Sequence, residues 1–128
     1  MKARTAITLG VVAGFALGAT SIHTLYAQAK APAFLVVEVD PINPEQYAKE
    51  YAPKAQALTR KHGGKVLAAS NSVTTLAGAP AKRIAVIQHE SVEQIMAWNN
   101  APEQHELRKT GEKYAKFRIV LVPGLPPQ

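Results

Sequence analysis

The chain has 128 residues, a formal net charge of +6 at pH 7 and no cysteine. The lack of cysteine excludes disulfides, thiolate catalysis and cysteine-bound metals. The basic residues are scattered, and the only adjacent pairs are Arg60-Lys61, Lys82-Arg83 and Arg108-Lys109. A nucleic-acid groove needs a dense basic stripe with aromatic residues between the charges, so we expect no nucleic-acid partner.

Residues 1–29 have the pattern of a secretory signal peptide. Lys2 and Arg4 give a positive start, residues 6–19 are mostly apolar, and the segment ends in Ala27-Gln28-Ala29. We predict cleavage between Ala29 and Lys30, with Ala19 and Ser21 offering an earlier alternative. The apolar run is shorter than the ~20 residues that span a bilayer, so an uncleaved membrane anchor is the less favoured interpretation. The pattern predicts a periplasmic or secreted protein that has no membrane contact after cleavage, with one domain over residues 30–128.

The predicted mature chain opens on an apolar, mostly β-branched run. Residues 34–40 predict a central strand, which Pro41 ends. The segment Asn43-Pro44-Glu45-Gln46 predicts a helix start, with an Asn cap and Pro at the first helical position. Tyr47, Tyr51, Ala55 and Leu58 then recur along one helical face. Pro53 should kink or divide this helix because it lacks a backbone donor, and Gly63-Gly64 ends it.

The second half repeats this alternation of strand and helix. Residues 65–78 predict a strand with a break at Ser70-Asn71-Ser72, residues 79–81 a loop, and residues 83–89 a third strand. Ser91-Val92-Glu93-Gln94 is a capping-box pattern that opens a second helix. Asn99-Asn100-Ala101-Pro102 interrupts this helix, and a further helical segment runs from Pro102 to about Lys113. Residues 116–122 predict the last strand.

The order of these elements predicts an α+β fold, the ferredoxin-like βαββαβ unit. In that arrangement the helices cover one face of the sheet and leave the other face bare. In residues 34–40 and 117–122, however, apolar side chains occupy both sets of alternating positions, so both faces of these strands are apolar. Since a bare apolar sheet face is not tolerated on a monomer, we predict a homodimer in which two such faces meet as a dimeric α/β barrel.

Residues 34–124 also resemble a known family. The carriers are the opening strand, Tyr47, Tyr51, Gly63-Gly64-Lys65 with Val66-Leu67-Ala68, Leu76-Ala77-Gly78, Ser91-Val92-Glu93, Trp98, Ala101-Pro102-Glu103 and Ile119-Val120-Leu121-Val122-Pro123-Gly124. In order and spacing they resemble the family called domain of unknown function 1330, within the dimeric α/β-barrel superfamily. The resemblance implies a two-subunit barrel with a pocket between sheet and helices in each subunit, and it implies no established reaction.

Three positions depart from the pattern of that family. His89 stands where members usually have an aromatic residue after the third strand, and Asn99 and Gln104 stand where Tyr is frequent. We expect these positions near the implied pocket, so the identity of a ligand is not carried over from the family.

His89 is the candidate catalytic residue, because it ends a strand just before a helix start and imidazole can accept a proton near neutral pH. The alternative is a hydrogen-bonded structural histidine. Tyr47, Tyr51, Trp98 and Arg108 are candidate ligand-binding residues, although aromatic residues at helical spacing are more often core.

Two charged residues within the predicted strands suggest a structural ion pair. Glu38 lies inside an apolar strand, where a buried carboxylate needs a partner, and Arg118 in the adjacent last strand is the predicted partner. His105-Glu106-Leu107-Arg108-Lys109 is not a zinc-protease motif, because its fifth residue would have to be His. With no spaced ligand triplet, we predict no metal and no cofactor; a haem site is a third, weaker alternative.

The leading functional hypothesis is an exported domain that binds, or modestly turns over, a small, partly apolar molecule. If it is an enzyme, superfamily relatives imply cofactor-free proton transfer or oxygenation. The rival hypothesis is a non-enzymatic dimer with a structural or protein-binding role. A cavity lined by His89 and Trp98 favours the first hypothesis, and a filled core there favours the second.

Overall fold

Four strands form one antiparallel sheet in a computed structural model, which describes residues 31–127. The strands are β1 (Ala33–Pro41), β2 (Lys65–Ser70), β3 (Arg83–His89) and β4 (Ala115–Pro123), in the order β2-β3-β1-β4. The α+β class and the pairing of the first strand with the last are confirmed. The predicted signal peptide and its cleavage site at Ala29 and Lys30 lie outside the described residues.

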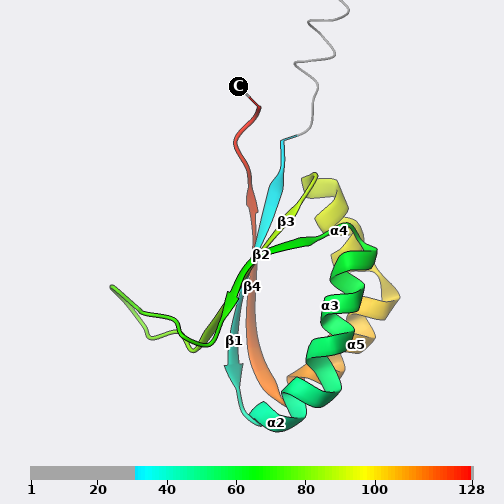
Figure 1. The fold of residues 1–128 in the computed structure, drawn as a ribbon. Helices are drawn as coiled ribbons and strands as arrows, with labels where there is room; N and C mark the ends of the chain where they lie inside the picture. Colours follow the sequence, from blue (N-terminus) through cyan, green and yellow to red (C-terminus); the bar gives the residue numbers. More distant parts are fainter. Residues whose placement is uncertain (1–30, 128) are drawn as a thin grey trace, which may run out of the picture. The chain divides into compact units, whose positions relative to one another are not determined.

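All the described helices lie on one side of this sheet (Figure 1). They are α2 (Pro44–Gln46), η1 (Tyr47–Tyr51), α3 (Ala52–Lys61), α4 (Val92–Asn100) and α5 (Pro102–Glu112). The predicted caps are present, since Asn43 Oδ1 accepts from the Gln46 N–H at 3.2 Å and Ser91 Oγ accepts from the Gln94 N–H at 3.2 Å. Gly63 ends α3 at φ +79°, a left-handed conformation that glycine adopts without strain.

The interruption expected at Pro53 takes the form of a wide turn rather than a break. The element η1 is a single π-helical turn, in which the Ala52 N–H donates to the carbonyl of Tyr47, five residues earlier. Pro53 then falls in the first turn of α3, where its missing donor does no harm.

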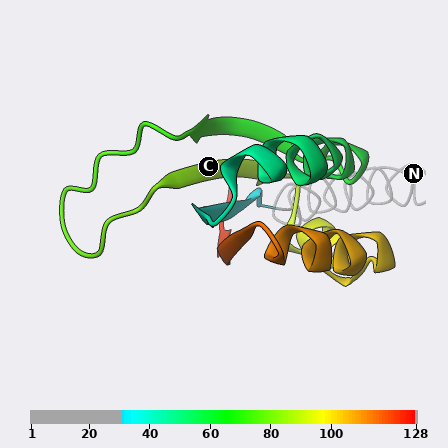
Figure 2. The ribbon, with the colours of Figure 1, turned by 90° about the horizontal axis from the view of Figure 1, so that it is seen from below.

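The second strand is shorter than predicted. It ends at Ser70, not at residue 78, and its irregularity lies between Val66 and Ala68 instead of at Ser70-Asn71-Ser72. Ser70 Oγ accepts from the Ser72 N–H at 2.9 Å, so a local side-chain bond replaces the ladder there. Residues 71–82 form a long connection that leaves the sheet on the side away from the helices (Figures 1 and 2).

Strand register divides the sheet into two faces. One face of β1 carries Ala33, Leu35, Val37 and Val39, and this face meets the helices. The buried core there consists of Ala33, Leu35, Leu58, Ile87, Ile95 and Trp98. The opposite face has no helix over it among the described residues, and we call it the open face. It carries the side chains of Phe34, Val36, Glu38, Ile84, Val86, Arg118, Val120 and Val122.

Glu38 is therefore less buried than its apolar neighbours suggested. Its side chain keeps 36% of its exposure on the open face, because no described element covers that face.

Among the described residues, no helix is long and apolar enough to cross a membrane.

Candidate functional site

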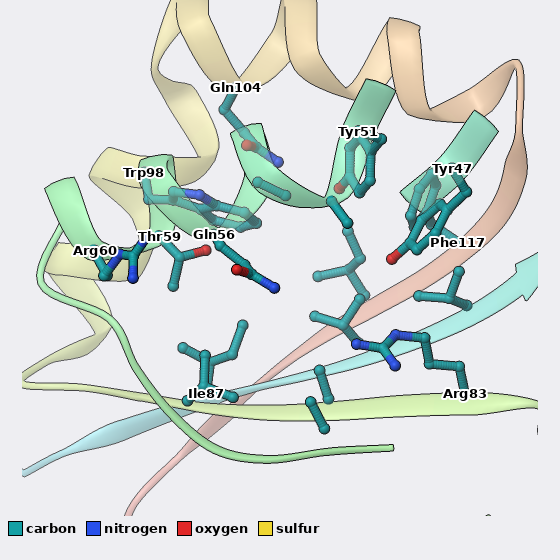
Figure 3. Close-up of a pocket in the computed structure, with 18 residues that line it drawn as sticks. Tyr47, Tyr51, Gln56, Thr59, Arg60, Arg83, Ile87, Trp98, Gln104 and Phe117 are labelled. Carbon is teal, nitrogen blue, oxygen red and sulfur yellow. The ribbon is translucent and has the colours of Figure 1, made fainter. Parts of the chain in front are cut away.

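A pocket of about 320 Å³ lies between the helices and the sheet (Figure 3). All four strands contribute to its floor, with Val37, Val39, Val66, Ala69, Arg83, Ala85, Ile87, Phe117 and Ile119. The helices supply its roof, with Tyr47, Tyr51, Ala52, Ala55, Gln56, Thr59, Arg60, Trp98 and Gln104. A ligand in this space would rest on an apolar floor and meet polar groups from above.

Small side chains keep the pocket open. Ala52 and Ala55 on α3 lie across from Ala69 on β2 and Ala85 on β3, so neither layer fills the space between them. Packed cores rarely leave a void larger than a water molecule. A space of this size lies at the lower end of the range for small-molecule sites.

Three aromatic rings close one end of the pocket. The Tyr51 ring lies 5.2 Å from that of Tyr47 and 5.1 Å from that of Phe117, measured between ring centroids. Gly111 on α5 makes this possible, because a Cβ there would lie 2.7 Å from the Tyr51 ring. Burial raises the pKa of Tyr51 to about 12, so its hydroxyl keeps its proton at neutral pH.

The polar group that stands out in the roof is Gln104 on α5. Its side chain is 2% exposed and points toward the pocket in Figure 3. Within the described part of the chain, its amide forms no hydrogen bond. In the described chain the fully buried side-chain N and O atoms without a partner are His89 Nε2 and Arg108 Nε, so the unbonded Gln104 amide reaches the open space of the pocket. The Gln104 amide is therefore available to donate or accept a hydrogen bond with a ligand in the pocket.

Two further polar groups of the roof also form no hydrogen bond within the described chain. Thr59 and Trp98 are 7% and 6% exposed, and both line the pocket. Neither the Thr59 hydroxyl nor the Trp98 indole N–H bonds to another described residue. Together with Gln104 they offer hydrogen bonds to a ligand along the helical side of the cavity.

The charges of the pocket are all positive. Among its described lining residues are Arg60 and Arg83, which lie at opposite ends in Figure 3, and no Asp or Glu. Arg83 is half-buried and donates to Asn71 Oδ1 at 3.0 Å. It also lies beside the Tyr47 hydroxyl, where its charge partly offsets the burial that raises the pKa of Tyr47. Arg60 is exposed.

His89, the predicted acid/base, lies outside the pocket lining. It is 1% exposed at the end of β3, with Nδ1 3.1 Å from Gln94 Oε1. Its Nε2 is buried without a described partner and faces Gly64, where a Cβ would come within 2.9 Å. The structure does not bring this ring to the space where Trp98 lies, so its catalytic role stays a prediction.

The other predicted ligand-binding residues divide into two groups. Tyr47, Tyr51 and Trp98 line the pocket. Arg108 does not; its Nη2 donates to Asn99 Oδ1 at 3.0 Å, which links α5 to α4. Asn99 and Gln104 were two of the departures from the family pattern, and only Gln104 lies at the pocket.

The predicted pair of Glu38 and Arg118 is present. The residues are directly opposite in the register of β1 and β4, with 3.7 Å between Arg118 Nη1 and Glu38 Oε2. The pair lies on the open face, on the other side of the sheet from the pocket. No group of three His, Cys, Asp or Glu side chains suited to a metal occurs among the described residues.

Several pocket residues were not among the predicted ones. Thr59 continues the four-residue spacing of Tyr47, Tyr51 and Ala55, which was a usable signal. Arg83 shares the parity of Ala85 and Ile87 along β3 and is also readable from strand alternation. Gln104 was expected near the pocket only from its departure from the family pattern, because its direction depends on how α5 packs over the sheet.

The fold has solved relatives. A crystal structure of a protein of unknown function from Rhodopseudomonas palustris is similar to this chain, with a TM-score of 0.62 at 16% identity over 84% of this chain and 94% of that chain. SnoaB, a cofactor-independent oxygenase from Streptomyces nogalater, gives a TM-score of 0.55 at 9% identity over 77% of this chain and 95% of that chain. At such identities the likeness shows the fold alone.

Sequence comparison assigns the chain to a family. No curated protein matches it. The family described as domain of unknown function (DUF1330) matches residues 32–125, which are nearly all of the described part of the chain. This match confirms the resemblance that the strand, tyrosine and glycine patterns indicated, and the chain belongs to the DUF1330 family.

Proposed function

We propose that this protein binds a small, partly apolar molecule in the pocket between helices and sheet. The observation that carries the proposal is the Gln104 amide, which faces an otherwise largely apolar cavity and forms no hydrogen bond within the described chain. A ligand oxygen or nitrogen that bonds to this amide would gain a hydrogen bond that is sheltered from bulk water. The apolar floor would supply the remaining affinity through burial of a hydrophobic ring.

The size of the pocket restricts the ligand. A volume of about 320 Å³ fits a molecule of one or two rings and excludes a peptide or an extended lipid chain. We propose binding in preference to acid–base catalysis, because His89 lies outside the pocket lining. No described lining residue is a histidine, so the pocket also offers no imidazole ligand for haem.

Trp98 provides the experiment. It is the single tryptophan of the chain and lines the pocket, so its fluorescence reports on occupancy. We expect a neutral nitroaromatic probe, 4-nitrobenzamide, to quench it saturably. Ala85→Phe should abolish saturation by filling the floor, whereas Ala57→Phe on the exposed side of α3 should not change it. Equal quenching of both variants and the native protein would contradict the proposal. So would mass spectrometry that finds no small molecule retained by the purified protein.

We further propose that two copies pair through the open face. Its apolar side chains have no cover among the described residues, and Val120 and Val122 are 36% and 45% exposed. Contiguous apolar patches of this kind mark contact surfaces. Glu38 and Arg118 give the face one negative and one positive charge side by side, which suits a self-complementary contact. This dimer leaves the pocket on the outer, helical side of each copy.

Export is the remaining proposal, and it rests on residues 1–29 of the sequence alone. We propose that this segment directs secretion and is removed between Ala29 and Lys30. Intact-mass measurement on a periplasmic or culture-medium fraction should show a chain that begins at Lys30. A full-length chain found only in the membrane fraction would support the uncleaved anchor instead.

A further inference from the structure

The position of Arg83 restricts the chemistry of the ligand. Its guanidinium stands at one end of the pocket, next to the Tyr47 hydroxyl and below the aromatic rings in Figure 3. Among the described residues it has no carboxylate partner; it donates a hydrogen bond to Asn71 and lies beside the Tyr47 hydroxyl. Asp40, which lies on the adjacent strand, is paired with Lys82 at 2.8 Å. Arg83 is thus a half-buried cation without a counter-ion.

Its neighbours hold this cation in place. The hydrogen bond to Asn71 at 3.0 Å restrains one side of the Arg83 guanidinium, and the adjacent Tyr47 side chain restricts its movement on the other side. A positioned guanidinium presents parallel donors that match the two oxygens of a carboxylate. Arg60 differs in this respect, because it is exposed and its side chain bonds to no other described residue. A long side chain without restraint loses more conformational entropy on binding a ligand than a side chain that is already held in place.

Arg83 also stands where a charged group can enter at low cost. With Tyr47 it lines a second, more open depression, which includes Pro41, Asn71 and Lys82. A carboxylate at this junction keeps part of its hydration, whereas a carboxylate on the apolar floor would lose it. The apolar floor beyond Arg83 is then available to the uncharged part of the ligand.

We infer that the ligand is a small aromatic or alicyclic carboxylate, whose charge Arg83 binds at the pocket mouth while its ring lies on the apolar floor toward Gln104. This inference rests on the proposed binding function and adds the charge and orientation of the ligand. Arg83 is a binding residue in this role, with Tyr47 as a second donor to the same group. The positive lining would disfavour cationic molecules of equal size.

A matched pair of probes tests the inference. The anion 4-nitrobenzoate and the neutral 4-nitrobenzamide have nearly the same shape, and both can be followed by quenching of Trp98 with correction for absorbance. In the native protein the carboxylate should bind at least tenfold more tightly, as a charge-assisted hydrogen bond predicts. Arg83→Met should remove this preference and leave amide binding within about twofold.

The controls separate the possible causes. Lys109→Met removes the same charge from an exposed residue of α5 and should change neither affinity by more than about twofold, because Lys109 lines neither the pocket nor the depression at its mouth. Arg83→Lys should keep an intermediate preference, since it retains charge without the planar fork. Thermal unfolding of each variant checks that the fold is intact.

Each outcome bears on one claim. If the amide binds and the carboxylate is no tighter, the anionic class is overturned while the binding function stands. If the preference survives Arg83→Met and is lost in Arg60→Met, the assignment to Arg83 is overturned. If neither probe binds the native protein, both the binding function and the inference are overturned.

Discussion

His89 Nδ1 lies 3.1 Å from Gln94 Oε1, and the Glu90 N–H donates to that same oxygen at 3.1 Å. Because the Glu90 N–H donates to this atom, it is the amide oxygen, and we assign His89 the tautomer that donates to it through Nδ1. The bond joins the end of β3 to the first turn of α4. His89 therefore occupies a structural position in which its ring is enclosed and its neighbours are fixed.

The first prediction concerns the stability contributed by this ring. His89→Phe removes the bond to Gln94 and places a larger ring against Gly64, where a Cβ would already lie 2.9 Å from Nε2. We expect a loss of about 1–3 kcal/mol in the free energy of unfolding, measured with urea. His105→Phe, the same change at an exposed site, should stay within about 0.5 kcal/mol. If His89→Phe keeps full stability but abolishes a measured turnover, His89 is catalytic instead.

The second prediction concerns Gly111, which lies inside α5. Alanine is the better helix former by about 1 kcal/mol, so propensity alone predicts stabilisation. The added Cβ would lie 2.7 Å from the Tyr51 ring and 2.9 Å from Phe117. We expect Gly111→Ala to destabilise the fold by about 1–3 kcal/mol and to weaken probe binding, because Tyr51 must shift. Glu112→Ala, in the same turn but exposed, serves as the control; a stabilised Gly111→Ala would refute the close packing.

The third prediction concerns pH. Burial raises the pKa of Tyr51 from 10.0 to about 12. A phenol whose folded pKa is raised binds its proton more tightly in the folded state. Its contribution to stability is therefore complete below about pH 10 and is lost as pH rises toward 12. The loss should be on the order of 2 kcal/mol.

Tyr51→Phe isolates this effect from the lysines that titrate in the same range. Urea unfolding at a series of pH values from neutral to alkaline should show a steeper decline for the native protein than for the variant. Parallel curves for the two proteins would mean that Tyr51 ionises freely and that its hydroxyl is open to solvent.

The fourth prediction concerns the open face. Strand register places Val120 on this face, and Ile119 in the pocket, so Val120→Asp introduces a charge where a second copy would pack. We expect this variant to sediment as a monomer and the native protein as a dimer at micromolar concentration, because an unpaired buried charge is strongly unfavourable. Met96→Asp introduces the same charge on α4, where Met96 is 43% exposed, and should leave the dimer intact. A native protein that sediments as a monomer contradicts the dimer outright.

The fifth prediction separates two roles of Glu38. Its pair with Arg118 is solvent-exposed in the single copy, at 36% and 76%, and such pairs contribute about 0–1 kcal/mol. In dilute, monomeric protein, Glu38→Gln should therefore change unfolding by less than about 1 kcal/mol. At a dimer contact the same change leaves Arg118 unpaired, so the dimer dissociation constant should rise at least tenfold. An unchanged dissociation constant would place the pair at the edge of the contact or outside it.

Local signals along the sequence were enough to predict most elements of the fold. Asn43 and Ser91 cap helices, Gly63 ends one, and the apolar run at 34–40 is the central strand, because caps and turns depend on a few neighbouring residues. The second strand was predicted too long, since whether Val73 and Leu76 belong to a sheet depends on a partner strand that the sequence does not display. The alternation of β1 and β4 indicated two apolar faces, and only the register showed that Val120 lies on the open one.

The pocket was only partly predictable. Tyr47, Tyr51 and Trp98 were predicted from helical spacing and family resemblance, and they do line the cavity. The sequence alone determined the order of the elements, the caps and the amphipathic faces, because these follow from short-range chemistry. Only the tertiary structure decided that His89, Asn99 and Arg108 lie outside the pocket lining while Gln104 reaches it. That choice depends on the packing of α4 and α5 over the sheet, where side chains distant in sequence compete for the same space.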